Sequence, residues 1–444
     1  VYAAGFLPVG LWGGTGTFQR SNRYIQSFAC SILRADLELG LAGKYDFLRA
    51  VLIPTQCDTL KCVCEDFKAA VPQVPVIGVT IPHNRTIQAA HGQLLDEFDY
   101  LTASLRAIQT PDCRPMPLEE AFAVYEDHRA AVRAFLDLVP DHLVTVGPKA
   151  RHLVLKAAWS MDKRLYTEKL RRLTDLLKAQ PKEDFDGHRF VVTGIMLDAE
   201  PVLDLPEELH VGVVDDLLCH ESLQIRTPTR PGGTVSSRLA YRYLDLRGAS
   251  PLHDPGKPRG AILAQLVRDR GADAVLFAQM KFCDPEAFDR PIVAQDLAAS
   301  GIPMLTLEHD QLVPSVGQLR TRLQAFLETA CPDAAERSEA MYLGIDIGSS
   351  SSKAAILDPQ GRLLAAEVVQ RGTGTRGPEE VLARVLARAG LDRADLRRTV
   401  VTGYGRMTFQ GADEQRTEIA CHAKGVWHLS PDVRTIVDVG GQDT

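Results

Sequence analysis

The chain has 444 residues, of which 45% are apolar and 24% charged, so it is long enough for several globular domains. Its formal net charge of −7 argues against a protein that depends on contacts to nucleic-acid phosphates. No apolar run reaches the roughly 20 residues of a membrane span, and no secretory signal opens the chain. We therefore expect a cytoplasmic protein with no nucleic-acid or membrane partner. The start at Val1 and the end at "VGGQDT", directly after a strand-like run, indicate a fragment cut at both ends.

Strand-like and helix-like runs alternate along most of the chain, which is the pattern of parallel sheets with crossover helices. "FLRAVLIPT" and "VPVIGVTIP" predict two strands, and an amphipathic helix follows them. Apolar residues at spacings of three and four then predict a helical segment. Beyond it, "RFVVTGIML", "HVGVVDD", "ADAVLFAQMKF" and "IPMLTLEHD" predict four more strands.

These patterns predict an α/β fold: two Rossmann-like α/β units with a helical insert, followed by a further α/β unit. "CPDAAERSEA" is short and polar, and we expect it to be a linker. The expected divisions are a first α/β unit over 1–115, the helical insert over 116–185, a second α/β unit over 186–330, the linker over 331–340 and the last unit over 341–444.

Three of the nine cysteines fall within "PTQCDTLKCVC", as Cys57, Cys62 and Cys64. Their spacing is not that of a zinc knuckle or a thioredoxin-type pair, and free cysteine is often simply buried. Cys30 is predicted at a helix start and Cys283 at the end of a strand. Loops after parallel strands converge on one crevice, so three cysteines from three loops could hold three irons of a cubane cluster. Burial as plain thiols stays open for each.

A second group of residues favours phosphate binding in the last hundred residues. "LGIDIGSSSSKAAIL" predicts a strand, a polar turn and a second strand, and its turn residues are Asp346, Gly348, Ser349, Ser350 and Lys353. Small residues let backbone N–H groups approach a phosphate, and an ordinary polar hairpin is the alternative. "RTIVDVGGQDT" predicts a similar turn, with Asp438, Gly440, Gly441 and Gln442. Two such turns can clamp a triphosphate from both sides.

Two other patterns compete with this interpretation. "GTGTRG", over 372–377, fits the glycine pattern of a dinucleotide-binding turn, but the next predicted strand lacks the acidic residue that such a site needs. Glu418, Cys421 and His422 could share one helical face, although such sets are usually plain helix surface.

The motifs of the last hundred residues together resemble one family. "GIDIGSSSSK", "TGYGR", "EIACHA" and "IVDVGGQD" are similar to motifs of the actin-like activator ATPases of 2-hydroxyacyl-CoA dehydratases and benzoyl-CoA reductases. The resemblance implies an actin-like fold for 341–444 and an Mg·ATP site. Asp346, Gly348, Ser349, Ser350, Lys353, Asp438, Gly440, Gly441 and Gln442 would form it.

The first 330 residues resemble the catalytic subunits of the same systems, through stretches such as "FACSILRADLELGLAGKYDFL", "PTQCDTLKCVCEDF" and "KFCDPEAFDRP". The resemblance implies that Cys30, Cys57 and Cys283 ligate a [4Fe–4S] cluster. Cys62 is similar to a position of the reductase and double-cubane branches, where it would be an extra ligand. No catalytic acid or base is assigned.

Together the two resemblances imply ATP-driven, low-potential electron transfer for reductive chemistry on an acyl-CoA. They imply an electron donor such as ferredoxin or flavodoxin, and a homodimer formed through the ATPase domain. A double-cubane reductase of small molecules and a cluster-free nucleotide-switch or scaffold protein are the alternatives.

Overall fold

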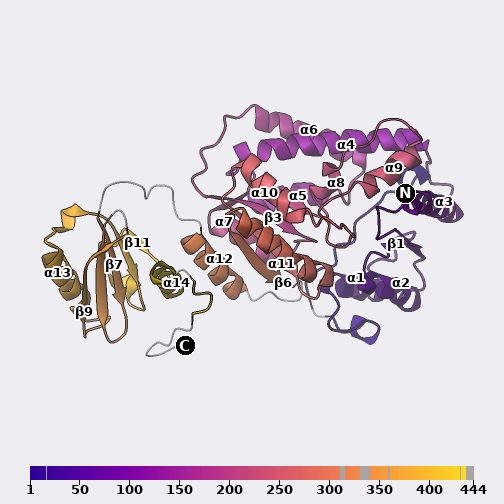
Figure 1. Ribbon diagram of the computed structural model, residues 1–444. Coiled ribbons are helices and arrows are strands. Elements are labelled where there is room, and N and C mark those ends of the chain that lie inside the picture. Colours follow the sequence, from indigo (N-terminus) through magenta and orange to yellow (C-terminus); the bar gives the residue numbers. More distant parts are fainter. Residues whose placement is uncertain (17, 311–315, 331–340, 359–360, 431, 437–444) are drawn as a thin grey trace. The chain divides into compact units, whose positions relative to one another are not determined.

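The computed structural model describes residues 1–444 except 17, 311–315, 331–340, 359–360, 431 and 437–444. The chain divides into two compact units, Val1–Arg320 and Thr321–Thr444, whose elements are labelled in Figure 1. Each unit contains its own sheet and its own apolar core.

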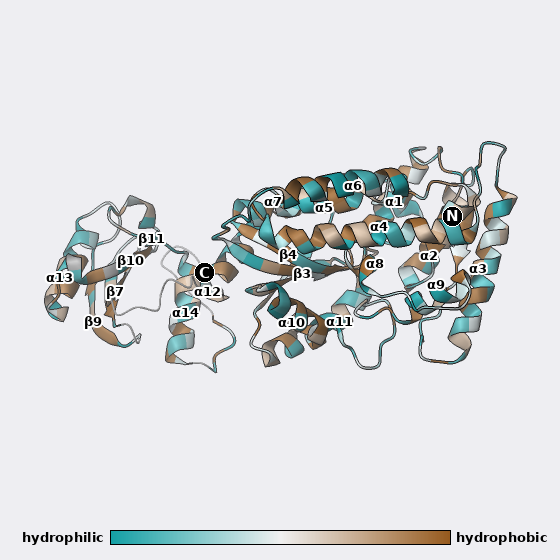
Figure 2. Ribbon diagram, turned by 90° about the horizontal axis from the view of Figure 1, so that it is seen from above, coloured by the Kyte–Doolittle hydropathy of each residue, from teal (hydrophilic) through white to brown (hydrophobic). Residues whose placement is uncertain are grey.

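The larger sheet of the first unit is parallel throughout, with the strand order β4-β3-β5-β6. In Figure 2 its strands lie between the layer of α4–α6 and the layer of α10 and α11. Because helices cover both faces, the strands are mostly apolar, and every residue of β4 is buried, Asp215 and Asp216 included. The strands are β3 (His188–Gly194), β4 (Val211–Leu218), β5 (Ala274–Met280) and β6 (Met304–His309), and the two lower helices are α10 (Arg259–Arg270) and α11 (Asp284–Ala299).

The upper layer is the helical insert. Its helices are α4 (Leu118–Leu138), α5 (Pro148–Ala157) and α6 (Lys163–Lys178). Phe135 of α4 and Leu170 of α6 are buried in the same core cluster, as their helical spacing predicts. Helix α6 begins where the Asp162 carboxylate accepts hydrogen bonds from two backbone N–H groups of its first turn.

The N-terminal part of this unit contains a second, smaller parallel sheet with two strands, β1 (Val51–Pro54) and β2 (Val76–Val79). Both strands are shorter than the apolar runs that predicted them. The surrounding helices are α1 (Ser31–Leu41), α2 (Asp58–Ala70) and α3 (Ala89–Ala107). The buried Arg85 guanidinium donates to the carbonyls of Tyr243, Leu244 and Leu246, at the end of α9 (Val235–Leu244). It thus satisfies carbonyls that the helix leaves unpaired.

The second unit contains a mixed sheet with the strand order β11-β10-β7-β8-β9. Strands β7, β8 and β9 form an antiparallel meander, and β10 pairs parallel with β7 on the other side. Helix α13 packs against β8 and β9. The elements are β7 (Met341–Ile347), β8 (Ser352–Leu357), β9 (Leu363–Val369), α13 (Gly377–Ala389), β10 (Leu396–Thr402), β11 (Glu414–Gln415) and α14 (Glu418–Leu429).

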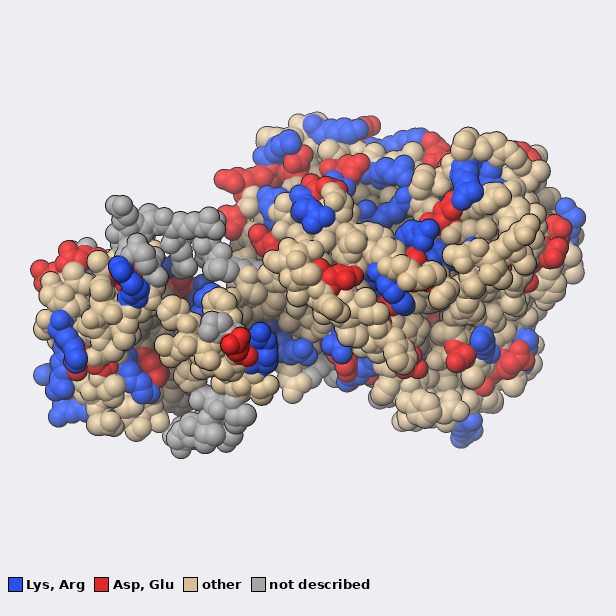
Figure 3. All heavy atoms as spheres, in the orientation of Figure 1, with Lys and Arg blue, Asp and Glu red and all other residues tan. Residues whose placement is uncertain are grey.

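The predicted α/β class with parallel sheets is confirmed. The remaining helices are α7 (Glu200–Glu208), α8 (Leu223–Arg226) and α12 (Val316–Ala330). Among the described helices, none combines the length and the apolar character that a bilayer crossing requires. On the face of the first unit drawn in Figure 3, acidic and basic side chains are interspersed.

Candidate functional site

In the first unit, three cysteines that lie far apart in the sequence each stand at the start of a helix. Cys30, Cys57 and Cys283 are the N-cap residues of α1, α2 and α11. Cys57 follows β1 and Cys283 follows β5, so both lie at the carboxyl ends of parallel strands. The residue before Cys283, Phe282, has a φ of 61°, an uncommon conformation that turns the chain from β5 into α11. Three helix N-termini therefore present thiols.

The three thiols also influence one another electrostatically. Burial is the main cause that raises the pKa of Cys30, to about 12, and it raises the pKa of Cys57 and Cys283 as well. The Cys57 thiol contributes to the rise at Cys30, and both of these thiols contribute at Cys283. The Leu60 N–H donates to Cys57 Sγ at 3.4 Å, which favours a thiolate. Burial therefore disfavours the thiolate form of all three cysteines.

The three thiols do not form a single-ion site within the described residues. Within the described residues, the one group of ligand atoms that all lie within 4.8 Å of one another is His152, His220 and Glu221, and the three cysteines do not meet that limit. A cluster is larger than one ion and is held by thiolates from separate loops. Helix N-termini offer N–H groups and a favourable dipole to the thiolates.

The other two cysteines of α2 differ from Cys57. Cys64 is 3% exposed and packs in the core beside Phe67, as plain packing predicts. Cys62 is exposed, so burial as a plain thiol is wrong for this residue. It stays a candidate extra ligand, one turn along the same helix.

The first predicted phosphate turn joins β7 to β8. Gly348 N–H donates to the Ser351 carbonyl at 2.9 Å and closes the turn that contains Ser349 and Ser350. Lys353 lies opposite Asp346 in the strand pair, and its Nζ is 2.8 Å from Asp346 Oδ2. Both side chains are partly exposed. A carboxylate, an ammonium and small turn residues thus share one accessible edge.

Two glycine-rich loops lie against this turn. Their contact with it was not predicted from the sequence. Thr373 N–H donates to the Gly348 carbonyl, and Gly405 N–H donates to the Ile347 carbonyl. A Cβ on Gly372 would lie 2.2 Å from the Ser349 oxygen. The "GTGTRG" segment therefore packs on the phosphate turn instead of forming a dinucleotide site of its own. The glycines of this segment were the sequence signal that could have indicated this packing.

Gly403 has a φ of +91°, and a Cβ there would lie 2.5 Å from Asp346 Oδ1. "TGYGR" is thereby fixed beside the aspartate. Glu418, Cys421 and His422 do not form a metal-binding group in the described part of the chain. The second turn, with Asp438, Gly440, Gly441 and Gln442, lies outside the described residues.

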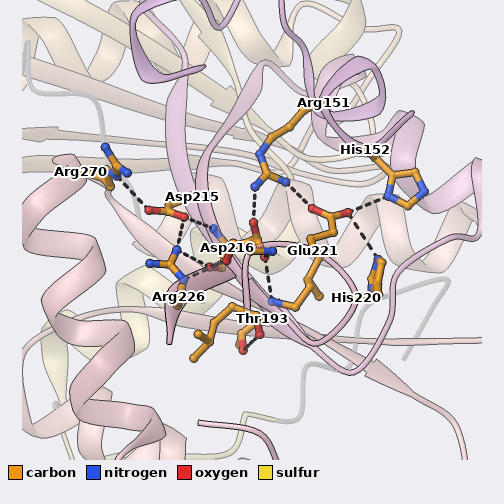
Figure 4. Close-up of polar contacts among 12 residues, drawn as sticks. Arg151, His152, Thr193, Asp215, Asp216, His220, Glu221, Arg226 and Arg270 are labelled. Atoms are coloured by element: carbon orange, nitrogen blue, oxygen red, sulfur yellow. Dashed lines mark hydrogen bonds and ion pairs between the residues drawn. The ribbon is translucent and has the colours of Figure 1, made fainter. Parts of the chain in front are cut away.

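A buried polar network at the carboxyl end of β4 was not predicted (Figure 4). Arg151 of α5 pairs with Asp216 and Glu221, and His152 hydrogen-bonds Glu221 at 2.8 Å. Burial alone would raise the pKa of Glu221, but Arg151 and His152 outweigh it and hold that pKa well below its usual range. Sequence spacing gives no signal for this network, because its members meet only through tertiary packing.

The two units thus define a class: a parallel α/β unit in which three cysteines begin three helices, followed by a unit with a polar, glycine-rich turn between two strands. Residues 1–330 match the family model for the 2-hydroxyglutaryl-CoA dehydratase D-component, and residues 343–444 match that for the BadF/BadG/BcrA/BcrD ATPase family. The chain belongs to the 2-hydroxyglutaryl-CoA dehydratase D-component family, and its C-terminal part carries the activator-type ATPase match.

Individual relatives agree with both matches. The (R)-phenyllactyl-CoA dehydratase beta subunit of Clostridium sporogenes is 37% identical over 329 residues, 74% of this chain and 88% of that protein. The activator of lactoyl-CoA dehydratase from Anaerotignum propionicum is 55% identical over 104 residues, 23% of this chain and 40% of the activator. The solved Acidaminococcus fermentans (R)-2-hydroxyglutaryl-CoA dehydratase component A is 42% identical over 23% of this chain and 40% of its own, with a TM-score of 0.23.

Proposed function

We propose that this chain drives low-potential electron transfer with ATP and delivers the electron to an iron–sulfur cluster for the dehydration of a 2-hydroxyacyl-CoA. The matches to a dehydratase component and to an activator ATPase within one chain support this combination. In the proposal, one polypeptide contains both the ATP-dependent donor part and the acceptor part.

The observation that carries the proposal is the shared position of Cys30, Cys57 and Cys283. Each cysteine is the N-cap residue of a helix, and the Cys30 and Cys57 thiols lie close enough to Cys283 to contribute to its raised pKa. A [4Fe–4S] cluster held there, when bound, supplies one-electron reduction at low potential. The chain would contribute three thiolates and the backbone N–H of Leu60, which helps set the potential by hydrogen-bonding sulfur.

In the second unit, Asp346, Ser349, Ser350 and Lys353 would hold Mg·ATP. With Mg·ATP bound, Lys353 would meet a phosphate oxygen in place of Asp346, and Asp346 would orient water around Mg²⁺. Gly348, with Asp438, Gly440, Gly441 and Gln442, would complete the site. Exchange of the Lys353–Asp346 pair for nucleotide contacts gives two states for the turn, which is what a nucleotide switch needs.

The test is iron analysis of anaerobically purified protein. We expect about four iron and four sulfide per chain, with loss of most of this iron in Cys57→Ser and unchanged ATP hydrolysis. Cys64→Ser, on the same helix but in the core, is the matched control and should keep its iron. Colourless protein with stoichiometric zinc would contradict the cluster.

Cys62 decides between this proposal and a double-cubane reductase of small molecules. Its exposure on α2 keeps it available as a ligand. Roughly eight iron per chain, reduced by half in Cys62→Ser, would favour the double cubane. A chain that hydrolyses ATP but binds no iron would favour the nucleotide-switch scaffold.

A further inference from the structure

The three helices that begin at the candidate cluster ligands differ at one equivalent position. The third residue after the N-cap cysteine is Leu33 in α1, Leu60 in α2 and Glu286 in α11. The two leucines pack against the apolar core of the N-terminal part, whereas the Glu286 side chain is completely buried. One of the three candidate ligands, Cys283, therefore has a buried carboxylate one helical turn away.

This carboxylate does not act as an ordinary helix cap. A glutamate at this position commonly turns back and accepts a hydrogen bond from the backbone N–H of the N-cap residue. In α11 the Cys283 N–H donates to the Met280 carbonyl instead, at 3.2 Å. Glu286 Oε1 accepts from Arg259 Nη1 at 2.6 Å and from Ser250 Oγ at 2.7 Å. Arg259 is the first residue of α10, which packs beside α11 (Figure 2).

The second oxygen of the carboxylate, Oε2, is buried and has no hydrogen-bond partner among the described residues. Anchoring of α11 requires only Oε1, which Arg259 and Ser250 already use. A buried acceptor without a donor costs stability, and a redox role is one of the reasons that a protein retains such a group. The open oxygen also leaves part of the negative charge of Glu286 without a compensating donor.

The charge of Glu286 acts on the Cys283 thiol. Burial is the main cause that raises the pKa of Cys283, and among the charges that raise it further, Glu286 comes before Cys30 and Cys57. A negative charge in a protein interior disfavours any additional negative charge close to it. The same repulsion applies to an electron added to a cluster at this position.

We propose that Glu286 lowers the reduction potential of a cluster held by Cys30, Cys57 and Cys283, through a buried negative charge beside Cys283. The inference rests on the proposed function for the cluster itself. Charge near an iron–sulfur cluster is one of the factors that set its potential. Glu286 would thus make the electron on the cluster more strongly reducing without ligating iron, and Arg259 would hold the carboxylate in position.

The test is a redox titration of anaerobically purified protein, followed by electron paramagnetic resonance of the reduced cluster. Glu286→Gln removes the charge and keeps the shape of the side chain. We expect the equilibrium constant for one-electron reduction to rise about tenfold, a positive shift of about 59 mV in the midpoint potential. The iron content should stay unchanged, because Glu286 is not a ligand.

Asp289→Asn is the matched control, because Asp289 is a second buried carboxylate on α11. Asp289 pairs with Lys257 at 2.7 Å and lies about 4.5 Å farther along the helix from Cys283 than Glu286 does. This variant should change the equilibrium constant less than about twofold. Equal shifts in the two variants, or no shift in Glu286→Gln, would overturn the inference.

A double variant guards against a folding defect. Glu286→Gln alone leaves the Arg259 charge buried without its partner, which is costly. Arg259→Gln combined with Glu286→Gln removes both charges and leaves two neutral amides. We expect a smaller positive shift in this protein, because the carboxylate is the charge on the helix turn of the ligand. An unchanged or more negative potential would overturn the inference.

A second readout needs no iron. In iron-free protein, the rate at which iodoacetamide alkylates each cysteine, followed by mass spectrometry, reports the thiolate fraction. In Glu286→Gln, Cys283 should react several-fold faster, with little change at Cys30 and Cys57. A protein that binds no iron would contradict the proposed function, whereas unchanged reactivity of Cys283 would overturn this inference, so the two failures are distinguishable.

Discussion

Arg259 and Glu286 form a buried ion pair that anchors the first turn of α11, with Arg259 Nη1 2.6 Å from Glu286 Oε1 and side-chain exposures of 4% and 0%. Glu286 lies three residues after Cys283, the N-cap residue of this helix. The pair therefore fixes the helix end that presents a candidate cluster ligand. Ser250 and Thr193 give the guanidinium further oxygen partners.

Removal of the Arg259 charge should destabilise the first unit strongly. Arg259→Met leaves Glu286 charged without its partner in the interior, and we expect a loss of about 3–5 kcal/mol in the free energy of unfolding. Denaturation in urea measures this loss. Arg171→Met, which breaks the exposed pair with Asp127, is the control and should cost under about 1 kcal/mol. Equal effects of the two variants would contradict the anchoring role.

Ionisation of Asp36 should lower the free energy of unfolding as the pH rises from about 4 to about 6. Burial raises the pKa of Asp36 from 3.8 to about 6, although Tyr45 and Gly13 donate hydrogen bonds to it. The folded state then holds a proton that the unfolded state releases, so the contribution is present below pH 4 and lost above pH 6. Asp36→Asn keeps an oxygen for both donors and should add about 3 kcal/mol of stability at pH 7.

The measurement is urea denaturation at pH 4, 5, 6 and 7. The gain from Asp36→Asn should grow over this interval and then level off. Asp127→Asn, at an exposed site of α4, should change stability by less than about 0.5 kcal/mol at every pH. A pH-independent gain at Asp36 would mean that ionisation is not its cause.

Gly403→Ala should abolish nucleotide binding. The backbone φ of +91° disfavours a side chain, and the new Cβ would collide with Asp346 Oδ1 and the Ile347 carbonyl. Binding of a fluorescent ATP analogue measures the effect. Gly425→Ala in α14 meets no atom within 4 Å and should bind the analogue normally, with a stability gain of about 0.5–1 kcal/mol.

Lys353→Gln should weaken nucleotide binding strongly and change the free energy of unfolding only slightly. The pair with Asp346 is partly exposed, so its loss should cost under about 1 kcal/mol. A phosphate would lose a point charge, and we expect the affinity for the ATP analogue to fall about tenfold or more. Arg384→Gln breaks an exposed pair with Glu380 on α13 and should leave the affinity unchanged. An unchanged affinity in Lys353→Gln would remove Lys353 from the site.

The strongly patterned elements were predictable from the sequence. Strands β3 to β6 are predominantly apolar, and α4 and α6 show clear helical spacing, so local signals were sufficient. The helix start at Cys30 and the polar turn at Gly348 were also correctly predicted. Their short-range patterns decide the backbone conformation with little help from the rest of the chain.

The contacts between loops could not be predicted in the same way. Gly403 meets the phosphate turn because β10 pairs with β7, and Gly372 meets it because β9 pairs with β8. A sequence pattern does not encode which strand lies beside which. His152 and Glu221 likewise meet through packing of α5 near the end of β4. The apolar run before β1 predicted a longer strand than the four residues that find a partner in β2.

The three N-cap cysteines are not translated together. Cys30 and Cys57 leave the ribosome before Cys283, which follows only after the helical insert and three strands of the larger sheet. A nascent chain therefore presents an incomplete set of candidate ligands until β5 has been synthesised. We expect iron to be captured completely only after β5 has joined the sheet, which makes cofactor loading a late event and a direct reporter of correct folding.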